Sequence, residues 1–144
     1  MSKSIIKEIQ VYRVSSVLNN DRKLYGKKYL FDGKDETCWN SDGGSPQWIE
    51  FSFPDTKSVE QLIIQFQGGF AAKSCMLQAI FDSTEDPAGT GATNTYQFHP
   101  KDSNTSQTFA VHNLLPCKKF KLTFDSSYDF YGRIIIYNVD IIGS

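Results

Sequence analysis

The most informative stretch of the chain reads Leu30-Phe31-Asp32-Gly33-Lys34-Asp35-Glu36-Thr37-Cys38-Trp39-Asn40-Ser41-Asp42-Gly43. An apolar pair precedes an Asp-Gly turn, and a polar loop separates Trp39 from Trp48, which opens a strand. Asp-Gly is a strong turn signal because glycine adopts positive φ without strain and aspartate bonds its own backbone. The stretch therefore predicts a turn and a loop that lead into a β-strand.

Beyond this stretch toward the C-terminus, apolar and polar residues alternate with the period of a strand. The clearest strand is Ser58–Gln67, with Leu62, Ile64 and Phe66 on one face. Further strands are predicted at residues 48–53 (ending at Pro54), 118–124, 133–142 and, more weakly, 75–81, 93–98 and 107–111. In residues 118–124, lysines alternate with apolar residues, which indicates one wet and one buried sheet face.

Turn-rich segments separate these strands at residues 40–46, 85–92 and 125–129. Strands spaced by eight to twelve residues are typical of a β-sandwich or barrel. The only helical turn expected lies around residues 29–31 or 84–86. We therefore predict an all-β fold of about eight antiparallel strands, with one domain over residues 1–144.

Charge and cysteine content argue against several classes of protein. The net charge is -1 and the pI is about 6.1, so direct nucleic-acid binding is not expected. Cys38, Cys75 and Cys117 are odd in number and irregularly spaced, which fits neither a disulfide framework nor a zinc site. With no secretory signal at the N-terminus and no apolar run of about 20 residues, we expect no membrane span and a reducing compartment.

Catalytic motifs do not appear in the sequence. His99 and His112 form no paired metal motif, and there is no glycine-rich phosphate loop or GxSxG elbow. No neighbouring motif activates Cys38 or Cys75 as a nucleophile. The sequence predicts a binding protein rather than an enzyme, with no cofactor.

The Leu30–Gly43 stretch resembles the signature of the discoidin superfamily, also called factor V/VIII type C or galactose-binding-like. Two further motifs agree in order: Gln67-Gly68-Gly69-Phe70 resembles that family's protruding loop, and Ile134–Gly143 resembles its final strand. The resemblance implies a jelly-roll β-sandwich, and says little about the ligand because the fold carries many functions. Secreted members usually join their first and last strands by a disulfide, whereas this chain has no cysteine at either end.

Four stretches also resemble a family of small nuclear-receptor-associated proteins: Arg13–Asn19, Phe31–Asp42, Gln65–Phe70 and Asp129–Arg133. This resemblance implies a protein of the cytoplasm and nucleus that represses a nuclear receptor by binding it. Thr37–Gly43 is also similar to the Doc domain of the anaphase-promoting complex, a discoidin fold that recruits protein substrates.

Calcium is a second hypothesis for the loop that contains Asp32, Asp35 and Thr37, because calcium prefers several hard oxygen ligands. Carbohydrate-binding relatives use such a loop, but Lys34 stands where they often have aspartate and Asn138 roughly where they have glutamate. The alternative is a tight turn at Asp32-Gly33 whose side chains bond backbone amides.

Aromatic residues near the loops have two interpretations each. Trp39 and Trp48 could form a stacking platform, but large rings beside apolar strands favour a place in the core. Phe70 is either an exposed anchor at the tip of the Gly68-Gly69 loop or part of a bulge that folds inward. Arg133 is expected to pair with Asp129 or Asp42.

We therefore predict a protein-interaction module that binds its partner, a nuclear receptor by resemblance, through loops at one end of the sandwich. The predicted contact residues are Ser15, Ser16, Asn19, Ser41, Asp42, Gly68, Gly69 and Phe70. The basic loop Asn19–Lys28 could meet an acidic partner or a phosphate, or be merely solvated. Two alternatives stay open: a calcium-assisted carbohydrate-binding module, and a structural subunit that uses the lysine-bearing sheet face.

Overall fold

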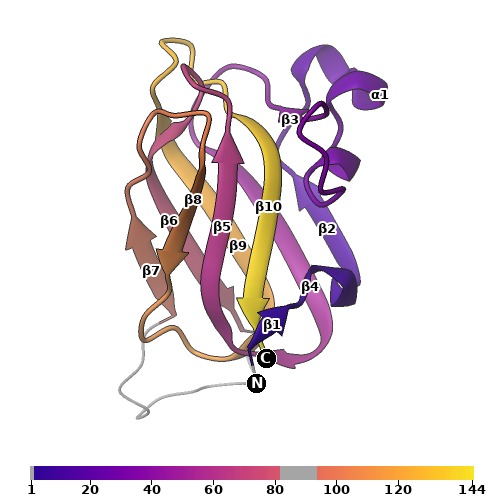
Figure 1. Ribbon diagram of the computed structural model, residues 1–144, viewed down its shortest axis with the longest axis vertical. Coiled ribbons are helices and arrows are strands. Elements are labelled where there is room, and N and C mark those ends of the chain that lie inside the picture. The colour runs from indigo at the N-terminus through magenta and orange to yellow at the C-terminus, as the bar shows by residue number, and fades with distance from the viewer. Residues whose placement is uncertain (1, 82–93) are drawn as a thin grey trace.

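Two antiparallel β-sheets pack face to face in the computed structural model, which describes residues 2–81 and 94–144 (Figure 1). The first sheet has the order β1 (Lys3–Ser4), β10 (Ile135–Gly143), β5 (Val59–Phe66) and β8 (Ser106–Ala110), and β3 (Trp39–Asn40) also pairs with β10. The second has the order β2 (Val11–Val14), β4 (Gln47–Lys57), β9 (Cys117–Ser127), β6 (Ala72–Ile80) and β7 (Thr95–Phe98). The predicted all-β sandwich is confirmed.

Short helical turns gather between β2 and β3. They are η2 (Leu18–Asn20), α1 (Arg22–Tyr25) and η3 (Lys27–Tyr29), and a further turn, η1 (Ile6–Glu8), follows β1. The Asp21 carboxylate accepts a hydrogen bond from the Leu24 N–H and so caps α1. The sequence predicted only one of these turns, near residue 29, because a single turn is too short to show a helical period. The alternative turn at residues 84–86 and the predicted loop at residues 85–92 lie outside the described residues.

Aromatic rings join the two sheets. Phe124 of β9 lies 6.2 Å from Phe66 of β5 and 6.1 Å from Trp39, measured between ring centroids. The predicted inward faces of β5 and β9 are fully buried, including Leu62 and Phe120 at 0% exposure. Alternation along each strand therefore places one apolar face of each sheet in a shared core.

The prediction that Pro54 ends its strand was wrong. β4 continues through Pro54 to Lys57. Its pairing with β9 is interrupted between Ser52 and Lys57, so no ladder hydrogen bond requires the N–H that proline lacks.

The prediction that Trp48 lies in the core was also wrong, whereas that for Trp39 was right. Trp39 has no exposed surface, and its Nε1–H donates to the carbonyl oxygen of Ser16 at 2.9 Å. Trp48 is half-buried on the outer face, with the Lys121 ammonium 5.0 Å from its ring centroid. The two residues differ because Trp48 alternates with the buried Gln47 and Ile49 of β4.

Every helix in the described part of the chain falls far short of the length and apolarity that a membrane span needs.

Replacing Leu62 with alanine is expected to lower the free energy of unfolding by about 2–5 kcal/mol, because it opens a cavity at a fully buried position. Urea denaturation measures the change. Leu24→Ala is the control: that side chain is 59% exposed, so a change within about 0.5 kcal/mol is expected. Equal losses in the two variants would contradict the described core.

Candidate functional site

Three loops meet at the end of the sandwich opposite the two chain termini (Figure 1). They are residues 41–46 before β4, residues 67–70 between β5 and β6, and residues 128–133 between β9 and β10. The Gly44 N–H donates to the Tyr131 carbonyl oxygen at 2.6 Å, and the Ile135 N–H donates to the Phe70 carbonyl oxygen at 3.2 Å. These backbone bonds join the three loops into one surface.

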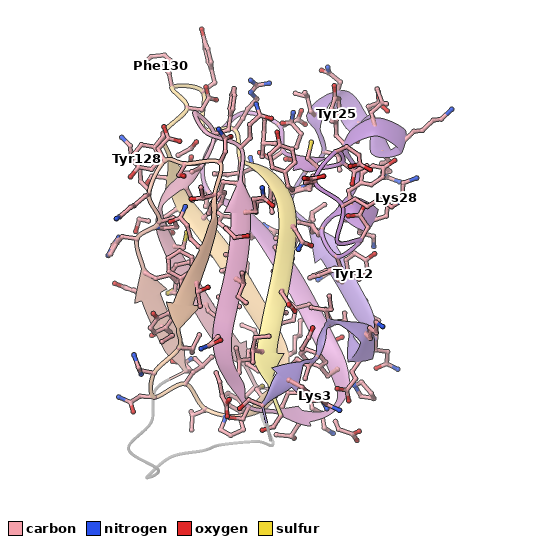
Figure 2. The ribbon with its side chains drawn as sticks, in the orientation of Figure 1. Lys3, Tyr12, Tyr25, Lys28, Tyr128 and Phe130 are labelled. Carbon is pink, nitrogen blue, oxygen red and sulfur yellow. The ribbon has the colours of Figure 1, made fainter. Side chains whose placement is uncertain are left out.

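The most exposed aromatic side chains of the described residues lie on this surface. Phe130 is 93% exposed and Tyr131 is 72% exposed, and their rings form an edge-to-face pair with centroids 5.3 Å apart. Figure 2 shows Phe130 projecting from this end of the molecule. We call Phe130 and Tyr131 the aromatic tip.

A glycine holds the aromatic tip against the neighbouring loop. Gly132 has a φ of +83°, and a Cβ atom there would lie 2.9 Å from the Gly44 carbonyl carbon. Both the positive φ and the close approach require glycine. The tip therefore stands on a tightly packed base.

Arg133 and Phe70 form the side of that base. The Arg133 Nε lies 3.7 Å from the Asp129 Oδ2, which also accepts a hydrogen bond from the Arg133 N–H. The guanidinium carbon lies 4.7 Å from the Phe70 ring centroid, and Phe70 is half-buried. The predicted Arg133–Asp129 pair is confirmed, and Phe70 packs beside Arg133 rather than forming the exposed anchor of the surface.

The Gly68-Gly69 turn is bonded from within the chain. The Gly68 N–H donates to the Asn104 Oδ1 and the Gly69 N–H donates to the Asp102 Oδ1, both at 2.7 Å. These two amides are therefore not free donors for a ligand. Partner binding by Gly68, Gly69 and Phe70 stays a prediction.

Gln47 is the centre of a polar network that includes several predicted contact residues. Gln47 is buried, with only 5% of the residue exposed. Its Oε1 accepts hydrogen bonds from the hydroxyls of Ser15 and Ser16 at 2.5 and 2.8 Å, and its Nε2 donates to the carbonyl oxygens of Asp42 and Gly44 at 3.1 and 2.9 Å. One buried amide thus ties the loop after β2 to the loop before β4.

Ser41, Asp42 and Asn19 extend this network. The Ser41 hydroxyl donates to the Asp42 carbonyl oxygen and accepts from the Ile134 N–H, and the Asn19 N–H donates to the Asp42 Oδ1 at 3.0 Å. Ser41 has no exposed surface, so in this conformation it positions the loops and offers a partner nothing to touch. Contacts from Ser15, Ser16, Asn19 and Asp42 to a partner stay a prediction.

The loop proposed for calcium has the hydrogen bonds of a side-chain-capped turn. The Asp32 carboxylate accepts from the Lys34 N–H at 3.0 Å and from the Thr37 hydroxyl at 2.6 Å, while Asp35 is exposed. In the described part of the chain, no three His, Cys, Asp or Glu side chains group together as metal ligands would. Asp32 and Thr37 are brought together, and calcium binding by them stays a prediction.

Burial suppresses the reactivity of the cysteines. Cys75 and Cys117 are buried and Cys38 is half-buried. Burial raises the pKa of the Cys38 thiol, and burial together with the nearby Asp125 carboxylate raises the pKa of the Cys75 thiol. A thiolate nucleophile is therefore disfavoured at both positions.

Phe130 and Tyr131 were not among the contact residues predicted from the sequence. The available signal was an aromatic pair between two turn-forming residues, Asp129 and Gly132. That pattern predicts a loop, but it does not show whether the rings turn inward.

Comparisons with known proteins agree with the fold and identify relatives. No family model matches the chain. The chain is 43% identical to the nuclear receptor 2C2-associated protein of Danio rerio over 143 residues, covering 99% of this chain and 97% of that protein. The human protein of the same name is 42% identical over 144 residues, covering 99% and 98%.

Solved structures of carbohydrate-binding and discoidin domains share the fold. A family 32 carbohydrate-binding module from C. perfringens in complex with galactose has a TM-score of 0.75 and 14% identity, covering 99% of both chains. An F5/8 type C domain from Bacteroides fragilis has a TM-score of 0.72 and 15% identity, covering 98% of this chain and 95% of that one. At such low identity, these structures show the discoidin-like sandwich and not the ligand.

Gln47→Ala is expected to lower the free energy of unfolding by roughly 1–3 kcal/mol, because the part-buried hydroxyl and carbonyl groups that it bonds lose their partner. Thermal or urea denaturation measures the loss. Gln97→Ala, at an exposed position of β7, is the matched control and should stay within about 0.5 kcal/mol of wild type. A neutral Gln47 variant would show that the network does not hold the loops.

Iodoacetamide at pH 8 is expected to label Cys38 slowly in the folded protein and to leave Cys75 and Cys117 unmodified, because both are buried. Mass spectrometry of digested samples measures each site, and full labelling in concentrated urea is the control. Labelling of Cys75 in the folded protein as fast as Cys38 would contradict this arrangement.

Proposed function

Because the chain belongs to the nuclear receptor 2C2-associated protein family, we propose that it binds a nuclear receptor through the aromatic tip and the loops that support it. The observation that carries the proposal is the exposure of Phe130 and Tyr131, at 93% and 72%. Aromatic rings are frequent anchors of protein interfaces because they bury a large apolar area at little cost in side-chain entropy. Burying one such ring in a partner contributes roughly 1.5–3 kcal/mol.

The base beneath the tip supports this role. The Gly44–Tyr131 backbone bond, the Asp129–Arg133 pair and the close packing at Gly132 hold the tip in place before a partner arrives. A preorganised loop loses less conformational entropy on binding than a free one. The residues of the Gln47 network act mainly as this support in the proposal, with Asn19 and Asp42 at the polar rim.

The names of the relatives support a receptor as the partner. The proposed output is repression of the receptor, in the cytoplasm and the nucleus, without catalysis by this chain. Glycan binding is the alternative, because exposed aromatic rings also stack on sugars and several structures of this fold are carbohydrate-binding modules.

The double variant Phe130→Ala with Tyr131→Ala is expected to lose at least about tenfold in affinity for the nuclear receptor 2C2 of the same organism, which corresponds to about 1.4 kcal/mol. Purified proteins and biolayer interferometry measure the affinity, and a receptor-driven reporter measures repression. Val11→Ala with Leu24→Ala is the matched control, because those side chains are 55% and 59% exposed elsewhere on the surface.

Three outcomes would overturn the proposal. The wild-type protein fails to bind the receptor, or the tip variant binds as well as wild type, or the control variant loses as much. Binding of galactose that disappears in the tip variant would instead favour the glycan alternative.

A further inference from the structure

A groove of about 620 Å³ lies beside β2, and its lining contains no residue of the three loops that meet at the aromatic tip. It is lined by residues 13–17, at the end of β2 and just beyond it, and by residues of α1, of η3 and of the turns beside them: Asn20, Arg22, Lys23, Gly26, Lys27 and Lys28. β2 is an edge strand of its sheet. The helical turns lie next to its unpaired edge (Figure 1). The volume is in the range of pockets that hold small ligands or short peptide segments, about 300–1,000 Å³.

The groove is lined by five cationic side chains and no anionic one. We call these the basic groove residues: Arg13, Arg22, Lys23, Lys27 and Lys28. Residues 13–28 contain one acidic residue, Asp21, so this segment has a net charge of +4. The rest of the chain has 10 basic and 15 acidic residues, so the positive charge is concentrated at this groove.

Four of the five cations have no carboxylate partner within the described residues. Arg13 pairs with Glu50. The ion pairs found in residues 2–81 and 94–144 otherwise involve Lys57 and Arg133, so Arg22, Lys23, Lys27 and Lys28 have no carboxylate partner there. All four are exposed.

Aromatic and backbone contacts orient the cations of η3 without cancelling their charge. The Lys27 ammonium donates to the Tyr12 carbonyl oxygen at 2.7 Å and lies 5.0 Å from the Tyr12 ring centroid. The Lys28 ammonium lies 5.1 Å from the Tyr29 ring centroid. Cation–π contact lowers the freedom of such side chains while leaving a positive field over the groove.

We propose that the basic groove binds an acidic, extended segment of a protein partner. Carboxylates spaced along such a segment match the unpaired guanidinium and ammonium groups of Arg22, Lys23 and Lys28. A nucleic acid is disfavoured, because the rest of the chain is net negative and would repel a long polyanion. A short acidic segment needs only the local field of the groove.

This inference goes beyond the proposed function because the cations that would bind the segment lie outside the aromatic tip and its three loops, although Ser15 and Ser16 of the Gln47 network also line the groove. Figure 2 shows Phe130 at the loop end and Lys28 on the flank beside Tyr12. A partner that reaches both surfaces would gain affinity from two linked contacts. Each contact can nevertheless be removed without the other.

The test uses the purified full chain and a fluorescein-labelled eight-residue peptide in which glutamate alternates with threonine. Anisotropy titrations at about 50 mM salt measure its affinity, because higher salt screens exposed charges. The groove variant is Arg22→Glu, Lys23→Glu and Lys28→Glu. The matched control reverses the same number of charges at exposed lysines elsewhere: Lys3→Glu, Lys101→Glu and Lys118→Glu.

We expect the groove variant to bind the peptide at least about tenfold more weakly than wild type, and the control variant to change by less than about threefold. Thermal unfolding establishes that both variants are folded. Phe130→Ala with Tyr131→Ala should bind the peptide as wild type does, which separates failure of this proposal from failure of the tip proposal.

Any of three results overturns the proposal. Wild type binds no better to the glutamate peptide than to its glutamine counterpart, or both charge-reversed variants lose equally, or an eight-nucleotide oligothymidine binds more tightly than the peptide. The last result would identify single-stranded nucleic acid as the ligand of the groove.

Discussion

The buried indole of Trp39 connects the hydrophobic core to the loop end of the sandwich. Its ring packs near Phe124 between the sheets, and its Nε1–H donates to the Ser16 carbonyl oxygen. Ser16 in turn bonds Gln47 and the Asp42 N–H through its hydroxyl. Burial of one large ring is therefore coupled to the conformation of two loops, because an unpaired indole N–H in the core would cost free energy.

Because of this coupling, the polar loop residues mainly support the fold. Two other surfaces, the aromatic tip and the basic groove, are left to contact a partner. Most hydrogen-bonding groups of Ser15, Ser16 and Ser41 are used within the chain. Phe130 and Tyr131 expose their rings, and the basic groove exposes cations most of which have no carboxylate partner in the described residues. An apolar anchor and a charged groove contribute differently to recognition. Burial of the aromatic rings in a partner supplies affinity, whereas the charges orient the partner and raise the rate of association.

Sequence patterns predicted the core strands well and the loop end less well. The alternation in β5 and β9 identified Leu62 and Phe120 as buried, because a strand face repeats every second residue. The pattern missed β2, and it placed Trp48 in the core although that side chain lies on the outer face. A single apolar residue in a strand carries no information about which face it occupies until the register with its neighbours is known.

The sequence by itself determined the all-β class, the discoidin-like signature and the inward faces of the main strands, since these depend on local turns and on a period of two residues. Only the tertiary structure decided that the polar residues of the loops bond one another, that Phe130 and Tyr131 point outward, and that five cations line one groove. Gln47 bonds Ser15 and Ser16 across more than 30 residues of sequence, and β2 meets η3 through Lys27 and Tyr12. Such contacts follow from how the two sheets and their connections pack, because residues distant along the chain meet only after that packing is complete.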